Sequence, residues 1–138
     1  STRGVMEVET PLISLAGNTD PEIQSLRTMN GGYLRTSPEF PLKRLLAAGS
    51  GDIFEMGRVF RAGEAGRSHN PEFTMLEWYE TNCSYENFID QTISLLRDSY
   101  AYMQDVFPFK KGNLKLDNFE KFSLNEAFMQ FVAVQRPI

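Results

Sequence analysis

The chain has 138 residues, of which 41% are hydrophobic and 23% charged, and this balance is typical of one soluble globular domain. A formal net charge of -4 argues against a surface built to follow nucleic-acid phosphates, although one local basic site remains compatible with it. The single cysteine, Cys83, excludes an internal disulfide and a cysteine-based metal cluster, and it favours a reducing, cytoplasmic compartment. No apolar run approaches the length that spans a membrane, so no membrane partner is expected.

Short extended segments are expected in the first part of the chain. Residues 5–10 read VMEVET and predict a strand that Pro11 ends, because proline cannot donate to a strand ladder. The run Asn-Gly-Gly at 30–32 predicts a hairpin-type turn. A short strand over 33–36 is expected to follow it.

A helix is predicted to open at residues 37–39. Ser37 suits the N-cap, Pro38 the first helical position, and the charge of Glu39 favours the positive end of the helix dipole. Leucines 42, 45 and 46 give the helix an apolar stripe, and Gly49 and Gly51 are expected to end it.

The centre of the chain predicts a β-hairpin, with strands over 53–61 and 73–80 on either side of a polar loop. Side chains alternate across a strand, so the hairpin can gather Arg61, Phe73, Glu77 and Tyr79 on one surface. Such a surface offers a cation for phosphate, a flat ring for a base, a carboxylate for an amine, and a phenol.

The second half of the chain is predicted to be mainly helical. Residues 84–107 place apolar side chains at three- and four-residue steps, with Ser84 as cap and Pro108 as stop, and this helix is expected to cover the sheet. A short strand is predicted over 119–123. Residues 123–126 are expected to open a final short helix.

The candidate residues also have ordinary interpretations. Arg61 could form a surface ion pair with Glu64 or Glu72, since exposed charge pairs are common. Phe73 could be a core side chain on pattern alone, and Tyr79 an amphipathic sheet residue.

The two carboxylates Glu39 and Glu77 come from separate elements. Paired carboxylates can also indicate a glycosidase or a metal site, but neither residue has a sequence context that supports those chemistries. His69 is more readily a residue that shapes the loop than a general base.

Three blocks together resemble the class II aminoacyl-tRNA synthetases of the lysine branch. The sequence FRAGEAGRSHNPEFTMLEWY, within 53–80, resembles motif 2; RGVMEVETP at 3–11 resembles the end of motif 1; and TSPEFPLKRLL at 36–46 resembles the amino-acid-binding segment. Within this family the chain is similar to the ligases that modify elongation factor P. The runs TSPE at 36–39 and EWY at 77–79 favour that branch over true lysyl-tRNA synthetases.

The resemblance implies an α+β fold with a mainly antiparallel sheet flanked by helices. It also implies that residues 1–138 form part of a catalytic domain, since no Gly-x-Gly-x-x-Arg segment of the motif 3 type occurs in them. Motif 1 lies at the dimer interface in the family, so a homodimer is expected for the full-length protein. ATP is implied as a substrate, with Mg²⁺ held by ligands outside this stretch.

The resemblance also assigns roles to the hairpin and its loop. Arg61 matches the arginine that holds the ATP α-phosphate and is catalytic in that sense, and Phe73 matches the ring stacked on adenine. At Gly63, where relatives have a side chain that contacts the nucleotide, only the backbone can do so, and Glu64 either takes over that contact or faces water. The implied nucleotide-binding set is Arg61, Gly63, Glu64, His69, Asn70 and Phe73.

Amino-acid recognition is implied for a second set of residues, namely Ser37, Glu39, Glu77 and Tyr79. The implied reaction is activation of lysine or β-lysine as its adenylate, followed by transfer to a lysine of elongation factor P. Aminoacylation of tRNA is one alternative. A non-catalytic, synthetase-like paralogue is another, supported by the missing motif 3 and by Gly63. The isolated stretch is expected to be inactive.

Overall fold

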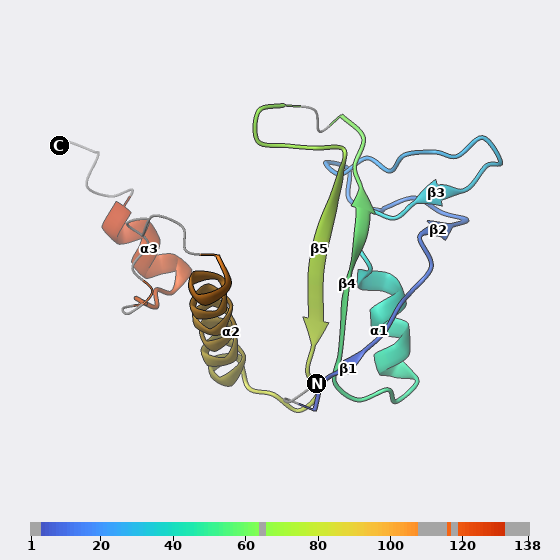
Figure 1. The fold of residues 1–138 in the computed structure, drawn as a ribbon. Coiled ribbons are helices and arrows are strands. Elements are labelled where there is room, and N and C mark those ends of the chain that lie inside the picture. The colour runs from blue at the N-terminus through green and yellow to red at the C-terminus, as the bar shows by residue number, and fades with distance from the viewer. Residues whose placement is uncertain (1–3, 64–65, 108–115, 117–118, 132–138) are drawn as a thin grey trace. The chain divides into compact units, whose positions relative to one another are not determined.

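The computed structural model describes residues 4–63, 66–107, 116 and 119–131 (Figure 1). The chain forms two compact units, Ser1–Cys83 and Ser84–Ile138. The candidate site residues belong to the first unit. Neither unit, in its described part, contains a helix that combines the length and the apolar character needed to cross a bilayer.

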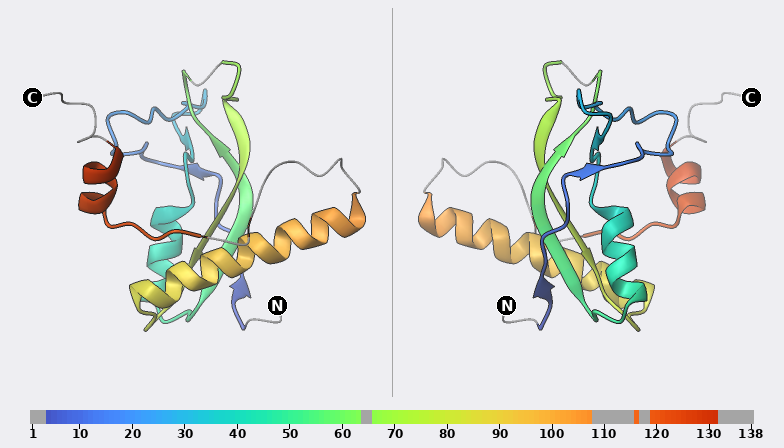
Figure 2. Two further views of the ribbon diagram at one scale, coloured as in Figure 1. Left: turned by 90° about the vertical axis from the view of Figure 1, so that its left-hand side faces the viewer. Right: turned by 90° about the vertical axis from the view of Figure 1, so that its right-hand side faces the viewer.

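The main sheet of the first unit has three strands in the order β1-β4-β5. Strand β4, Ile53–Phe60, pairs antiparallel with β5, Glu72–Tyr79, along its whole length (Figures 1 and 2). Strand β1, Met6–Glu7, pairs parallel with β4. The sheet is therefore mixed, and the expectation of a mainly antiparallel sheet is corrected. The long crossover between β1 and β4 returns the chain in its original direction, which a tight hairpin cannot do.

A second, two-stranded sheet lies within that crossover. Strand β2, Ile13–Ser14, pairs antiparallel with β3, Tyr33–Leu34. The predicted turn before β3 is confirmed, because the backbone N–H of Thr28 donates to the Gly32 carbonyl at 2.7 Å. The predicted strand over 33–36 is shorter than expected.

Helix α1, Glu39–Ala47, follows β3 and has a well-defined C-terminus. Gly49 has a φ of +88°, and the N–H groups of Gly49 and Ser50 donate to the carbonyls of Leu46 and Leu45, at 2.9 and 3.1 Å. This hydrogen-bond pair is the Schellman motif predicted for a glycine stop. The N-cap prediction was off by one residue: Pro38 is the cap, and Ser37 lies just outside.

The open end of the hairpin is fastened by Asp52. Its carboxylate accepts hydrogen bonds from the N–H and hydroxyl of Thr81, at 2.7 and 2.8 Å, and these bonds lower the pKa of Asp52. Leu42, Ile53 and Val59 are fully buried and form the apolar core of the unit's described residues. The hairpin and α1 are thus held by a small core, with polar contacts at the ends.

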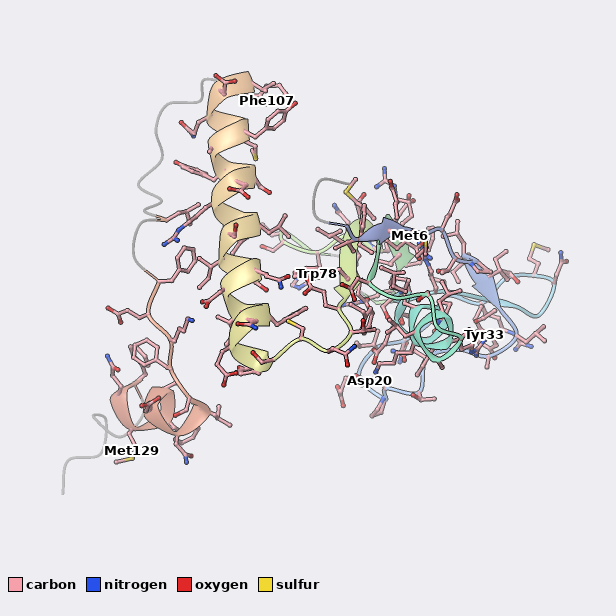
Figure 3. All side chains as sticks on the ribbon, turned by 90° about the horizontal axis from the view of Figure 1, so that it is seen from below. Met6, Asp20, Tyr33, Trp78, Phe107 and Met129 are labelled. Atoms are coloured by element: carbon pink, nitrogen blue, oxygen red, sulfur yellow. The ribbon has the colours of Figure 1, made fainter. Side chains whose placement is uncertain are left out.

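The described part of the second unit contains two capped helices. Ser84 caps α2, Tyr85–Val106, as predicted, by accepting from the N–H of Asn87 at 3.2 Å. Ser123 and Glu126 form a reciprocal capping box at the start of α3, Leu124–Phe131. Figure 3 marks Phe107 at the end of α2 and Met129 on α3. Pro108, the predicted stop, lies outside the described residues.

The prediction of a strand over 119–123 was wrong. This segment is irregular, and its side chains contact those of α2 and α3. The guanidinium of Arg97 lies 5.2 Å from the ring centre of Phe119, and Lys121 pairs with Asp90 at 2.5 Å. Contact with a helix gives the segment no neighbouring strand to pair with.

Candidate nucleotide and amino-acid site

The register of β4 and β5 sets which side chains share a face. Val59 lies opposite Phe73, and Glu55 lies opposite Glu77. Tyr79 lies opposite Ile53. Alternation then places Phe73, Glu77 and Tyr79 on one face of the sheet, the arrangement predicted from the sequence.

Arg61 and Phe73 meet at the loop end of this face. The guanidinium carbon of Arg61 lies 5.2 Å from the ring centre of Phe73, a cation–π distance. The Arg61 Nε donates to the Thr36 carbonyl at 3.4 Å, and its backbone N–H donates to the Pro71 carbonyl at 2.9 Å. Glu72, one ion-pair partner considered for Arg61, lies 3.6 Å from the Nε of Arg58. The structure therefore brings a cation and an aromatic ring together beside the loop.

Glu77, Tyr79 and Glu39 form an acidic group farther along the face. The Tyr79 hydroxyl donates to Glu77 Oε1 at 2.7 Å. Burial, this hydrogen bond and the charges of Glu77 and Glu39 together raise the pKa of Tyr79 well above its ordinary value. Two carboxylates from different elements thus act on one phenol, and the group favours a bound cation such as an ammonium.

The first residue of α1 and the residue before its cap supply the remaining predicted side chains. Ser37 Oγ accepts a hydrogen bond from the backbone N–H of Glu39 at 3.3 Å, and Glu39 Oε1 lies 2.5 Å from the Nζ of Lys43. The Lys43 pair is exposed on both sides, so it holds Glu39 only weakly. A ligand amine can therefore compete for the Glu39 carboxylate.

The loop between β4 and β5 carries the rest of the nucleotide-binding set. Gly63 is exposed, and a Cβ at this position would meet no atom within 4 Å. The backbones of Gly66 and His69 pair at N–O distances of 3.1 and 3.3 Å, so His69 helps to close a tight turn. His69 and Asn70 are exposed. Glu64 lies outside the described residues.

Sequence reasoning missed a buried polar cluster made of Thr10, Arg35 and Glu55, in which Glu55 lies on the same face as Glu77. Arg35 Nη1 donates to Glu55 Oε1 at 2.5 Å and to Thr10 Oγ1 at 2.9 Å, and the Thr10 hydroxyl donates to Glu55 Oε2 at 2.6 Å. The side chains of Arg35 and Glu55 are only 6% and 3% exposed. The cluster is thus a fully enclosed ion pair with a hydroxyl bridge.

Gly57 makes room for this cluster. A Cβ at position 57 would lie 2.5 Å from Arg35 Nη2, closer than side chains can approach. Two signals could have revealed the cluster: a glutamate between buried positions of one strand face requires a cation, and a glycine inside a strand indicates close approach of another group.

The described residues contain no group of three or more histidine, cysteine, aspartate or glutamate side chains arranged to hold a metal ion.

Comparison with known proteins agrees with the sequence resemblance. Residues 1–137 match the family of class II tRNA synthetases (D, K and N). The chain is similar to proteins named elongation factor P--(R)-beta-lysine ligase from Yersinia enterocolitica, with 41% identity over 96% of this chain and 39% of the relative. The proteins of the same name from Buchnera aphidicola and Proteus mirabilis are 39% and 42% identical, over 96% of this chain.

The chain spans about two fifths of the length of these curated relatives. The match nevertheless covers the whole region that contains the hairpin, its loop and the first turn of α1. The chain therefore belongs to the family of class II tRNA synthetases that comprises the aspartate, lysine and asparagine enzymes.

Proposed function

We propose that the protein to which this chain belongs is an ATP-dependent ligase that activates a lysine-like amino acid and transfers it to a lysine of elongation factor P. The names of the relatives support this proposal, at about 40% identity across nearly the whole chain. In the first step the amino-acid carboxylate attacks the α-phosphorus of ATP and pyrophosphate leaves. In the second, an acceptor amine attacks the carbonyl carbon and AMP leaves.

The observation that carries the proposal is the cation–π contact between Arg61 and Phe73. A guanidinium beside an aromatic ring offers contacts to a phosphate and to a base within one nucleotide's reach. On binding ATP, Arg61 would neutralise charge that develops on the α-phosphate, and Phe73 would stack on adenine. Gly63, Glu64, His69 and Asn70 would surround the nucleotide from the loop.

The acidic group is proposed to recognise the amino acid. Ser37, Glu39, Glu77 and Tyr79 would bind it, with the two carboxylates facing the amines of lysine or β-lysine. Tyr79 is protonated at neutral pH, as an ordinary tyrosine is, so it can donate or accept a hydrogen bond without adding charge.

Three further proposals concern the whole protein. Magnesium would accompany ATP, although no three-ligand group is found among the described residues. A homodimer would use the segment around β1 and β2, where Met6 and Ile13 are 50% and 57% exposed. A cytoplasmic location would suit the single cysteine.

The test is lysine-dependent exchange of pyrophosphate into ATP by the full-length protein, with lysine and β-lysine compared. Exchange of pyrophosphate into ATP that depends on a lysine-type substrate supports adenylate formation. Transfer is then measured from labelled amino acid to purified elongation factor P and, in parallel, to lysine tRNA.

The outcomes separate the alternatives. Labelling of elongation factor P alone supports the proposal, whereas labelling of tRNA identifies an aminoacyl-tRNA synthetase. Absence of exchange with every lysine-type substrate, in a folded full-length protein, would leave the non-catalytic paralogue. The Gly63 substitution is the feature that favours that last outcome.

A further inference from the structure

We infer that Arg35 is a positioning residue. It fixes the segment before α1 against β4, and so it sets the position of the acidic group relative to the Arg61–Phe73 pair. This inference rests on the proposed function. Its basis is the buried cluster of Thr10, Arg35 and Glu55 described above, none of whose members is in the proposed ATP or amino-acid set.

The side chain of Arg35 links its own segment to two others, the segment at Thr10 and strand β4. Besides its bonds to Glu55 and the Thr10 hydroxyl, Nη1 donates to the Thr10 carbonyl at 3.1 Å. Its Nε donates to the Arg58 carbonyl at 3.0 Å. One guanidinium therefore joins the end of the first motif to β4.

The backbone of Arg35 is held as tightly as its side chain. Its N–H donates to the Leu12 carbonyl at 2.9 Å, and its carbonyl accepts from the N–H of Phe60 at 2.9 Å. Residue 35 is thus anchored from both sides at the end of β4, just before Arg61.

The anchored residue is followed directly by site residues. The carbonyl of Thr36 accepts the Nε hydrogen bond of Arg61, and Ser37 and Glu39 come next. A shift at residue 35 therefore moves the acidic group relative to the Arg61–Phe73 pair. Because the acidic group is proposed to bind the amino acid, such a shift weakens binding of the lysine-type substrate and raises its KM.

The position of Arg35 can be disturbed in two independent ways. Arg35→Lys keeps the charge but cannot reproduce a fork that reaches both Glu55 and Arg58. Gly57→Ala keeps every charge and donor but places a methyl group 2.5 Å from Arg35 Nη2. Arg58→Lys is the matched control, because Arg58 lies on the opposite face of β4 and is 59% exposed.

The experiment uses the full-length protein and two readouts. In pyrophosphate exchange, Arg35→Lys and Gly57→Ala are expected to raise the KM for the lysine-type substrate at least tenfold, and Arg58→Lys to leave it unchanged. In hydrogen exchange, the amides of Arg35 and Phe60 are expected to exchange at least tenfold faster in the first two variants only.

A role confined to stability predicts a different result, namely a lower kcat from a smaller folded fraction, with unchanged KM and unchanged local exchange. That result would overturn the inference, as would failure of both variants to fold. If the wild-type protein shows no amino-acid-dependent exchange of pyrophosphate, the proposed function fails. The inference about Arg35 is then decided by hydrogen exchange alone.

Discussion

The guanidinium of Arg61 lies 5.2 Å from the ring centre of Phe73, and the two residues stand on opposite sides of the loop that joins β4 to β5. The hairpin register creates this contact, because Val59 faces Phe73 and Arg61 follows Val59 by two residues. A two-residue step returns the side chain to the same face. The nucleotide half of the candidate site therefore follows from strand geometry.

Phe73→Leu should weaken ATP binding while preserving the fold. Stacking on a base contributes about 1–3 kcal/mol, so the KM for ATP in pyrophosphate exchange should rise by about tenfold. The KM for the amino acid should hardly change. Phe60→Leu is the control, since Phe60 pairs with Glu72 and projects from the opposite face. Equal effects of the two substitutions would contradict a stacking role.

Tyr79→Phe should change the stability profile at alkaline pH. The folded protein raises the pKa of Tyr79 above its ordinary value of 10.0, so the folded state retains a proton that the unfolded state releases. Stability from this group is complete below pH 10 and is lost as the pH rises further. Wild-type protein should therefore lose more thermal stability than Tyr79→Phe between pH 9 and about pH 11. An equal loss of thermal stability in the two proteins would contradict the raised pKa of Tyr79.

Glu55→Gln should be strongly destabilising. It leaves the Arg35 guanidinium, 6% exposed, without its counter-charge, and breaking a buried ion pair costs about 3–5 kcal/mol. Glu72→Gln removes a carboxylate from the neighbouring strand, whose pair with Arg58 is more than half exposed, and should cost at most about 1 kcal/mol. Denaturant unfolding of the full-length variants measures both. Similar losses of unfolding free energy in the two variants would show that the Arg35–Glu55 pair is accessible to water.

Gly49→Ala should shorten or loosen the end of α1. A side chain at a φ of +88° is strained, and the left-handed region costs about 1–2 kcal/mol for a residue with a Cβ. Ala48→Gly tests the neighbouring position, which has ordinary helical angles. This substitution should lower the free energy of unfolding by less than Gly49→Ala. The measurement is the unfolding midpoint in denaturant. A neutral Gly49→Ala would show that the Schellman turn rearranges at no cost.

The parts of the fold that could be predicted were those with local signals. The alternation of side chains along β5 predicted which of them share a face. The serine of the capping box predicted the start of α3, and Gly49 predicted the end of α1. Each of these signals lies within a few residues of the structure it specifies. The roles assigned to Ser37, Glu39 and the loop residues stay predictions.

The missed features depend on residues far apart in the chain. Parallel pairing of β1 with β4 joins residues near 6 and 53, and nothing local to either segment encodes a direction. The Arg35–Glu55 pair spans 20 residues and is visible only once β4 is known to bury one face. The segment at 119–123 had the composition of a strand, but its partners proved to be helical side chains such as Arg97.

Strand β5 is an edge strand of its sheet, since within the described residues it pairs with β4 alone. The outer side of an edge strand is where a further strand can pair, and the side chain of Leu76, which projects from one face of β5, is 41% exposed. In the whole protein, this edge is where the sheet can grow. Expressed alone, the same edge would invite copies to join, so self-association should be expected before any assay of the isolated stretch.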